Sequence, residues 1–285
     1  MGRAELNASS QVFSTHLMYP SNTHIFCLLI GLYQTNAAVT YSNTSELQAD
    51  YRVRWTSNCS TDSPVVPHFE VASGTVCTLD GGPLTALSRG ESRDFAVSLD
   101  HTYNISSWRT WIDASFDYTA KTNSSTLVEL TRNDTPEHSV YFADVSVIDA
   151  ATYWVEVRSP TSDTGECTQV HNGTESSCQN IICKAPTEWQ CPAQNRFDFN
   201  ENGEYLSHSY LDANQSCVSN CTLLQTDEAC CRGEYASPEA CPNPNPELKK
   251  ACGEGYSYAF DDASATFTWT LPLQADSLIE IVACP

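Results

Sequence analysis

The fold of this chain is decided by the stretch NCTLLQTDEACCRGEYASPEACPNPNPELKKACGEGYSYAFDD, residues 220–262. It contains five cysteines and many Pro, Asn and Gly residues, but few apolar side chains. The wider region 167–252 holds ten of the 14 cysteines of the chain. Because such a region buries little apolar surface, we expect disulfides to hold it together. Short helices are expected around 223–230 and 247–252, the second of which follows three closely spaced prolines.

The sequence on both sides of this region has the pattern of β-strands. Short alternating runs are separated by Gly, Pro, Asn and Asp clusters between 51 and about 160, and similar runs return after 256. Such spacing is typical of a sandwich or barrel. We therefore predict a mainly β fold whose last strands complete the first sheet. The expected strands are 94–99, 125–130, 145–148, 154–157, 265–270 and 278–282.

An apolar run near the N-terminus, 25–33 (IFCLLIGLY), predicts a signal peptide. A membrane span needs about 20 apolar residues, so this run is too short to be one. A start at Met18 would give the signal an ordinary length. No anchor segment is expected near the C-terminus. The predicted organisation is a leader at 1–38, a polar spacer at 39–50, a β-sandwich at 51–160 completed by 261–285, and a disulfide-rich insert at 161–260.

The charge of the chain narrows the choice of partners. With 14 basic and 35 acidic residues among 285, the formal net charge is −21. Nucleic acids and anionic membrane surfaces are excluded as partners on this ground. Frequent N-x-S/T sequons, together with the cysteines, predict a secreted glycoprotein of the extracellular space or cell wall. A first sequon is at Asn7, and the expected acceptors are Asn43, Asn58, Asn104, Asn123, Asn133, Asn172, Asn214 and Asn220.

Several tokens of residues 220–262 together resemble one known family. TDEACCRGEYASPEAC, the later AC, YSYAFDD, TFT and the terminal CP follow the order seen in thaumatin-like (osmotin-like, pathogenesis-related) proteins. Upstream, LSRGES (87–92), TLVE (126–129) and DVSVIDA (144–150) resemble further motifs of that family in the same order. The resemblance runs from about residue 53 to the end. It implies a β-sandwich, a disulfide-rich second domain with loops and short helices, and an acidic cleft between them.

The resemblance also implies how the cysteines pair. This chain has Trp269 where the family usually has a cysteine, so Cys167 and Cys178, which are both near the place of that cysteine's partner, are expected to bridge each other. Cys77 has no counterpart in the family pattern. The implied pairs are Cys59–Cys284, Cys183–Cys252, Cys191–Cys217, Cys221–Cys230, Cys231–Cys241 and Cys167–Cys178.

An arginine and several carboxylates form the cleft that the resemblance implies. Asp144 and Asp149 would point to opposite faces of one flat strand, so a bend must lie between them if both reach the cleft. Arg109 lies one strand period before Trp111, the position that corresponds to the family arginine, and projects to the same face. The implied cleft residues are Arg109, Glu129, Asp144, Asp149, Asp261 and Asp262.

Three functions are compatible with such a cleft. The first is binding of β-1,3-glucan or another cell-wall polysaccharide in defence or wall remodelling, with Tyr153, Tyr256, Tyr258 and Phe260 as stacking platforms. The second is weak endo-β-1,3-glucanase activity with Glu129 as the acid and Asp149 as the base or nucleophile. The third is binding of a protein as an inhibitor or ligand. A monomer without cofactor or metal is expected.

The sequence DFNENG (198–203) begins like a calcium-binding loop but has Ser209 where a bidentate Glu is needed, so an exposed turn is predicted there.

Overall fold

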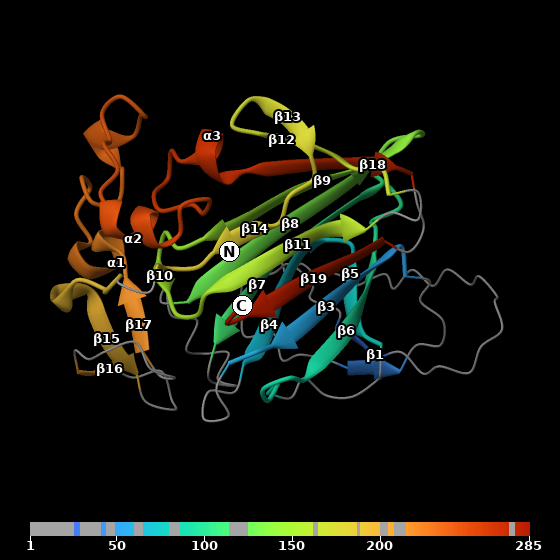
Figure 1. Cartoon of the computed structure of the whole chain (residues 1–285), viewed down its shortest axis with the longest axis horizontal. Helices are drawn as coiled ribbons and strands as arrows, with labels where there is room; N and C mark the ends of the chain where they lie inside the picture. The colour runs from blue at the N-terminus through green and yellow to red at the C-terminus, as the bar shows by residue number, and fades with distance from the viewer. Residues whose placement is uncertain are drawn as a thin grey trace, which may run out of the picture.

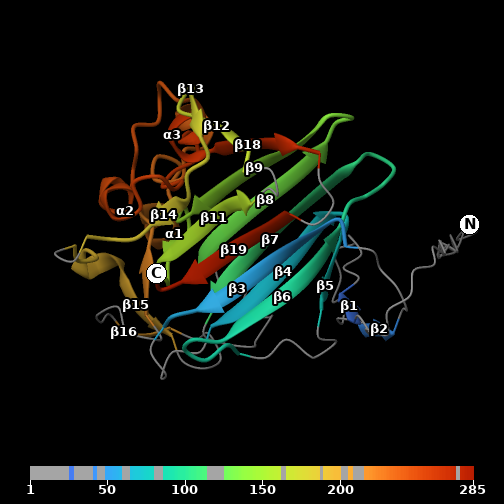
Figure 2. The same ribbon diagram turned by 45° about the vertical axis from the view of Figure 1, so that its right-hand side comes forward.

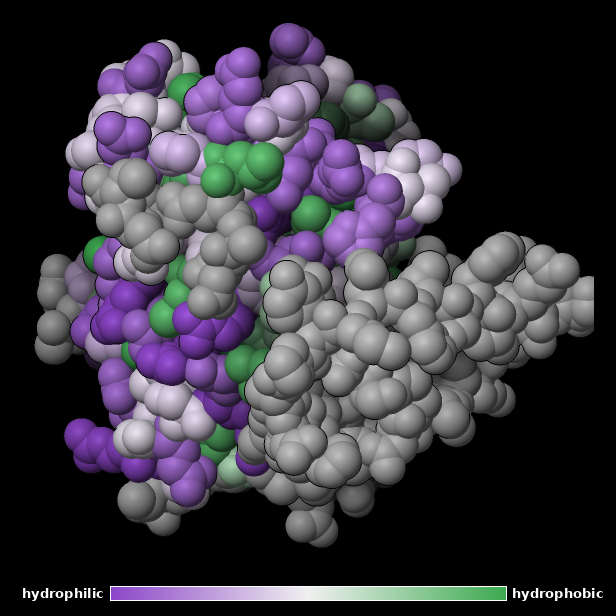
Figure 3. Space-filling model, turned by 90° about the vertical axis from the view of Figure 1, so that its right-hand side faces the viewer, coloured by the Kyte–Doolittle hydropathy of each residue, from purple (hydrophilic) through white to green (hydrophobic). Residues whose placement is uncertain are grey.

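In the residues that it describes, the computed structural model of the protein has three β-sheets and a few short helices (Figure 1). It describes residues 26–28, 41–43, 49–59, 65–79, 86–113, 125–161, 165–186, 189–199, 205–207, 215–273 and 277–285. Within these ranges, no helix is both long enough and apolar enough to cross a bilayer. On the coloured part of the face shown in Figure 3, the patches of hydrophobic residues are small, and hydrophilic side chains separate them, as expected for a strongly acidic chain.

One large sheet has eight strands in the order β14-β11-β19-β3-β6-β5-β1-β2. Neighbouring strands in this sheet are antiparallel, except that β19 pairs in parallel with β3 near the middle of the sheet. The C-terminal strand thus completes the first sheet. The bounds are β1 Phe26–Leu28, β2 Tyr41–Asn43, β3 Tyr51–Ser57, β5 Thr75–Thr78, β6 Ser92–Ser98, β11 Val155–Thr161, β14 Ile181–Cys183 and β19 Ser277–Ala283.

The other large sheet has seven strands in the order β13-β12-β18-β9-β8-β7-β4, all antiparallel. The strands β12, β13 and β14 lie in the range predicted as the insert, yet they pair with the two large sheets. The bounds are β4 Val66–Ser73, β7 Ile105–Asp113, β8 Thr126–Asp134, β9 His138–Ser146, β12 Thr168–His171, β13 Thr174–Ser177 and β18 Phe267–Pro272.

The two large sheets enclose the hydrophobic core between their inner faces. In β3 every second residue is buried, so Tyr51, Val53 and Trp55 point inward. Rings from opposite sheets touch: the centroids of Phe69 and Phe95 are 4.7 Å apart. The mainly β sandwich predicted from alternation is therefore present, and the alternation also decides which side chains face outward.

A disulfide-rich lobe lies beside one end of the sandwich (Figures 1 and 2). The helix expected at 223–230 is shifted, because Ser219 caps its N-terminus by accepting from the backbone N–H of Thr222, and Gln225 ends it in a left-handed conformation. The helix expected at 247–252 is present, and α3 was not predicted. The lobe contains a small sheet in the order β10-β17-β15-β16. Bounds are β10 Ala150–Ala151, β15 Arg196–Phe199, β16 Tyr205–Ser207, β17 Gln215–Val218, α1 Asn220–Leu224, α2 Pro246–Ala251 and α3 Asp262–Ala265, with 3-10 turns at Ala193–Asn195 and Gly233–Tyr235.

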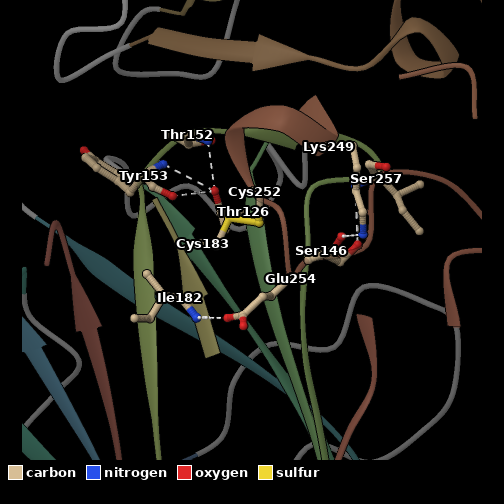
Figure 4. The surroundings of a disulfide bond; sticks show 12 residues. Thr126, Ser146, Thr152, Tyr153, Ile182, Cys183, Lys249, Cys252, Glu254 and Ser257 are labelled. Atoms are coloured by element: carbon tan, nitrogen blue, oxygen red, sulfur yellow. Dashed lines mark hydrogen bonds between the residues drawn. A yellow bond between two sulfur atoms is a disulfide. The ribbon is translucent and has the colours of Figure 1, made fainter. Parts of the chain in front are cut away.

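Covalent and polar links join the lobe to the sandwich around the Cys183–Cys252 disulfide (Figure 4). Next to it, the Ile182 N–H on β14 donates to Glu254 Oε2 at 3.0 Å. The backbone of Tyr256 exchanges hydrogen bonds with Val145 and Val147 of the sandwich at 2.9 and 2.8 Å. The position of the lobe is therefore fixed at the end of β9.

Gly255 makes the closest approach in this joint. A Cβ added there would lie 2.3 Å from Cys252 Sγ and 2.8 Å from the Val145 carbonyl oxygen. We expect Gly255→Ala to lower the free energy of unfolding by about 2 kcal/mol, because backbone and disulfide must move apart. Urea unfolding at equilibrium would measure this. The matched control is Gly253→Ala, where a Cβ meets nothing within 4 Å. Equal stability of the two variants would contradict the prediction.

Candidate functional site

Four charged side chains lie side by side across the outer face of the seven-stranded sheet. The strand register pairs Glu70 with Arg109, Arg109 with Glu129, and Glu129 with Asp144, on β4, β7, β8 and β9. Alternate residues of β8 and β9 are buried, which places Glu129 and Asp144 on the outward side. We call Glu70, Arg109, Glu129 and Asp144 the carboxylate row.

A cavity of about 330 Å³ lies on this face. One strand period along from the row, Ser107 and Thr131 are hydrogen-bonded through their hydroxyls at 2.9 Å. The cavity therefore combines charged groups with neutral hydroxyls. Its lining comprises Glu70, Ala72, Ser107, Trp108, Arg109, Glu129, Leu130, Thr131 and Asp144.

Asp144 is the least satisfied carboxylate of the row. Its Oδ1 atom is buried and has no hydrogen-bond partner within the described part of the chain. Burial raises the pKa of Asp144 well above its ordinary value, and the charges of Glu129 and Asp262 raise it further. Asp144 therefore favours the protonated form more than an exposed aspartate does.

Glu129 and Asp149 lie in a mixed electrostatic environment. Burial raises the pKa of Glu129; Arg109 lowers it, while Asp149 and Glu70 raise it. Burial also raises the pKa of Asp149, and Arg109 lowers it. Both carboxyls are thus close to the Arg109 guanidinium, which stabilises their ionised forms against the cost of burial.

Arg109 is held by Glu70, a residue that the sequence analysis missed. Arg109 Nε and Nη2 both donate to Glu70 Oε2, at 3.1 and 2.9 Å. The sequence pattern that could have identified Glu70 is the alternation in β4, which turns Glu70 outward between the buried residues Phe69 and Val71. The sequence did not indicate that β4 would lie next to β7.

A bend brings Asp149 toward the row, as the alternation argument required. β9 ends at Ser146, and Asp149 follows in a bend before β10. The Asp149 carbonyl accepts from the backbone N–H of Ser219 at 2.8 Å and from the Thr222 hydroxyl at 2.9 Å. The disulfide-rich lobe therefore holds this bend in place.

The two neighbouring aspartates at the start of α3 have different surroundings. Asp262 Oδ1 accepts from the Tyr256 hydroxyl at 2.6 Å, and its charge raises the pKa of Asp144. The carboxylate of Asp261 is 6% exposed and accepts from Lys249 Nζ at 2.9 and 3.0 Å. It also accepts from the backbone N–H of Ser257 at 3.0 Å. The charge of Asp262 therefore acts on the carboxylate row, whereas the carboxylate of Asp261 is bound by Lys249 and Ser257 inside the lobe.

The aromatic residues expected as platforms also differ from one another. Tyr153 is 7% exposed and packs in the core, so its ring is not available to a ligand. Tyr256, Tyr258 and Phe260 are half-buried. Among the residues that the structure describes, no cluster of three or more His, Cys, Asp or Glu side chains is arranged to bind a metal ion. Most of the calcium-like segment 198–203 lies outside those residues.

Among the residues that the structure describes, six disulfides cross-link the chain, and they join the pairs that the resemblance implies. Cys59–Cys284 closes a separation of 225 residues and ties the end of β3 to the end of β19. Cys27 and Cys77 are register partners on β1 and β5. The bonds are Cys59–Cys284, Cys167–Cys178, Cys183–Cys252, Cys191–Cys217, Cys221–Cys230 and Cys231–Cys241.

Fold and site together define a disulfide-braced β-sandwich protein with a pocket on one sheet that is lined by charged and hydroxyl side chains. The profile of the Thaumatin family matches residues 114–285, more than half of the chain, and this protein belongs to that family. The many disulfides within the described part of this family member are typical of an extracellular protein.

Curated relatives support the assignment. Thaumatin-like protein 1 of Arabidopsis thaliana is 32% identical over 152 residues, which are 53% of this chain and 47% of the relative. Pathogenesis-related thaumatin-like protein 3.7 of Cryptomeria japonica is 32% identical over 144 residues, covering 50% and 48%. Pathogenesis-related protein 5 of Arabidopsis thaliana is 30% identical over 148 residues, covering 50% and 49%. The chain spans about half the length of these relatives.

Proposed function

We propose that this protein is a secreted defence protein that binds cell-wall β-1,3-glucan in the cavity of the carboxylate row. The observation that carries the proposal is the buried, unpartnered Oδ1 of Asp144 beside Glu129. A buried polar atom without a partner costs free energy, and a sugar hydroxyl entering the cavity removes that cost.

The remaining lining suits a neutral, hydroxyl-rich ligand. Carboxylates accept hydrogen bonds from sugar hydroxyls, while Arg109 and the Ser107 and Thr131 hydroxyls donate to sugar oxygens. An anionic polymer is disfavoured, because three of the four residues in the row are acidic and the whole chain carries −21. The names of two relatives, which call them pathogenesis-related, support a role in defence.

Retention on insoluble β-1,3-glucan tests the proposal. Glu129→Gln removes one charge from the row and keeps the side-chain shape. We expect about tenfold weaker retention, the effect of losing one hydrogen bond to a charged group. The matched control is Glu234→Gln, on an exposed residue of the disulfide-rich lobe, which should bind like the unmodified protein. Cellulose serves as the polymer control.

The same assay separates glucan binding from glucan cleavage. The raised pKa of Glu129 favours the enzymatic alternative, because a general acid must hold its proton near the working pH. Release of reducing ends that is lost in Glu129→Gln would establish an endo-β-1,3-glucanase. Retention without release would establish a binding protein, and the absence of both would direct attention to a protein partner.

A further inference from the structure

A disulfide-closed hairpin projects from the edge of the seven-stranded sheet. β13 is the terminal strand of that sheet, and all four of its residues are exposed. The Cys167–Cys178 disulfide joins the residues that flank β12 and β13 at the base of the hairpin. The cross-link holds the hairpin and its tip in a fixed place beside the sheet.

The tip of the hairpin is an exposed N-linked glycosylation sequon. Asn172 and Gly173 have φ values of 49° and 68°, as in a two-residue turn of type I′. Asn172 is exposed, and a Cβ on Gly173 would meet nothing within 4 Å. Thr174 completes the motif Asn-Gly-Thr. The folded protein therefore has open space around the acceptor amide.

The strand register places this tip in line with the carboxylate row, two strands beyond Asp144. His171 of β12 pairs with Phe267 of β18, and Phe267 pairs with Ala143 of β9. Asn172 follows His171, and Asp144 follows Ala143. Each therefore lies one residue beyond this line of paired residues. Between them is Thr266. Its carbonyl is 3.2 Å from His171 Nδ1, and its hydroxyl is 2.7 Å from the Tyr256 hydroxyl. In Figure 1 the hairpin lies next to α3.

Asn220 provides a contrast within the same chain. Its side-chain Nδ2 donates to the Pro244 carbonyl at 2.6 Å, and its Oδ1 accepts from Asn195 Nδ2 at 3.1 Å. N-linked glycans are attached to Nδ2, so a sugar there would compete for space with the Pro244 carbonyl that this nitrogen contacts. The packing of Asn220 in the native lobe therefore disfavours a glycan at this residue.

We propose that Asn172 carries an N-linked glycan at the hairpin tip, in line with the carboxylate row, and that Asn220 stays unmodified. The proposal rests on the secretion that the proposed function includes. A new bond joins Asn172 Nδ2 to the anomeric carbon of an oligosaccharide supplied on a lipid pyrophosphate. The bond from that carbon to the pyrophosphate oxygen breaks, the lipid pyrophosphate leaves, and the amide gives up one proton. The attached sugar borders the cavity from the side of α3.

Mass analysis of glycopeptides from the full chain, secreted by a eukaryotic host, tests the proposal. Thr174→Ala removes the sequon while leaving the Asn-Gly turn intact, and Thr174→Ser keeps the sequon as the matched control. We expect a glycan on Asn172 in the unmodified protein and in Thr174→Ser, none in Thr174→Ala, and none on Asn220 in any of them.

Hydroxyl-radical footprinting tests the position of the glycan. Oxidation of Tyr256 should be at least about twofold higher in Thr174→Ala than in Thr174→Ser, because a bulky sugar limits access of solvent to nearby rings. Tyr103, 72% exposed and away from the hairpin, should be oxidised equally in both. An unmodified Asn172, a glycosylated Asn220 or equal oxidation of Tyr256 would overturn the proposal. None of these measurements uses glucan, so their outcome does not depend on whether the protein binds glucan.

Discussion

The double variant Cys59→Ala/Cys284→Ala is expected to lose about 5 kcal/mol of its free energy of unfolding. The bond closes a separation of 225 residues, so its removal restores the most conformational entropy to the unfolded chain. It also releases the end of β19, which lies between β11 and β3 inside the eight-stranded sheet. Guanidinium unfolding of the oxidised protein would measure the loss.

A short-loop bridge provides the control for this prediction. The double variant Cys167→Ala/Cys178→Ala opens a separation of only 11 residues, and the same entropy argument gives about 3 kcal/mol. The difference between the two double variants therefore isolates the effect of loop length. A larger loss from the hairpin bridge than from Cys59–Cys284 would contradict the argument.

Asp144→Asn is expected to have opposite effects on stability and on binding. At pH 7.5 it should raise the free energy of unfolding by about 3 kcal/mol, because it removes a buried charge beside an unpartnered oxygen. Glucan retention should fall at least about tenfold, as one charge-assisted hydrogen bond is lost. A side chain kept at a cost to stability is typical of a functional site.

The pH dependence of this stabilisation has a definite sign. Burial raises the pKa of Asp144 in the folded protein above its unfolded value, so the folded state binds the proton more tightly. The destabilisation by Asp144 is therefore present at neutral pH and disappears as pH falls through the raised pKa toward the ordinary carboxyl value of about 4. The advantage of Asp144→Asn should shrink in parallel.

Urea unfolding between pH 4 and neutral pH would measure this change. The exposed control Glu234→Gln removes the same charge and should stay within about 0.5 kcal/mol of the unmodified protein throughout. A constant advantage of Asp144→Asn at every pH, or a loss of stability at neutral pH, would show that the charge of Asp144 is not the cause.

Local sequence patterns predicted the β class, the second short helix and six of the strands, although the run 145–148 overlaps only the end of β9. Alternation in 125–130 predicted β8, and the last apolar run predicted β19. The first helix was misplaced, because Ser219 and Gln225, and not the composition of 223–230, set its two ends. Caps act through single side chains and backbone angles, which average composition does not reveal.

By itself, the sequence determined the outward faces of the strands, since these depend on alternation along the chain. The cysteine pairs were implied by the resemblance to the thaumatin-like family, because spacing alone does not give connectivity. Only the tertiary structure decided which strands are neighbours. That arrangement placed Glu70 against Arg109 and the charge of Asp262 near Asp144. It also paired Asp261 with Lys249 and put Asn172 in line with the carboxylate row, two strands beyond Asp144. Register across a sheet joins residues far apart in the chain, and periodicity within one strand contains no information about the strand beside it.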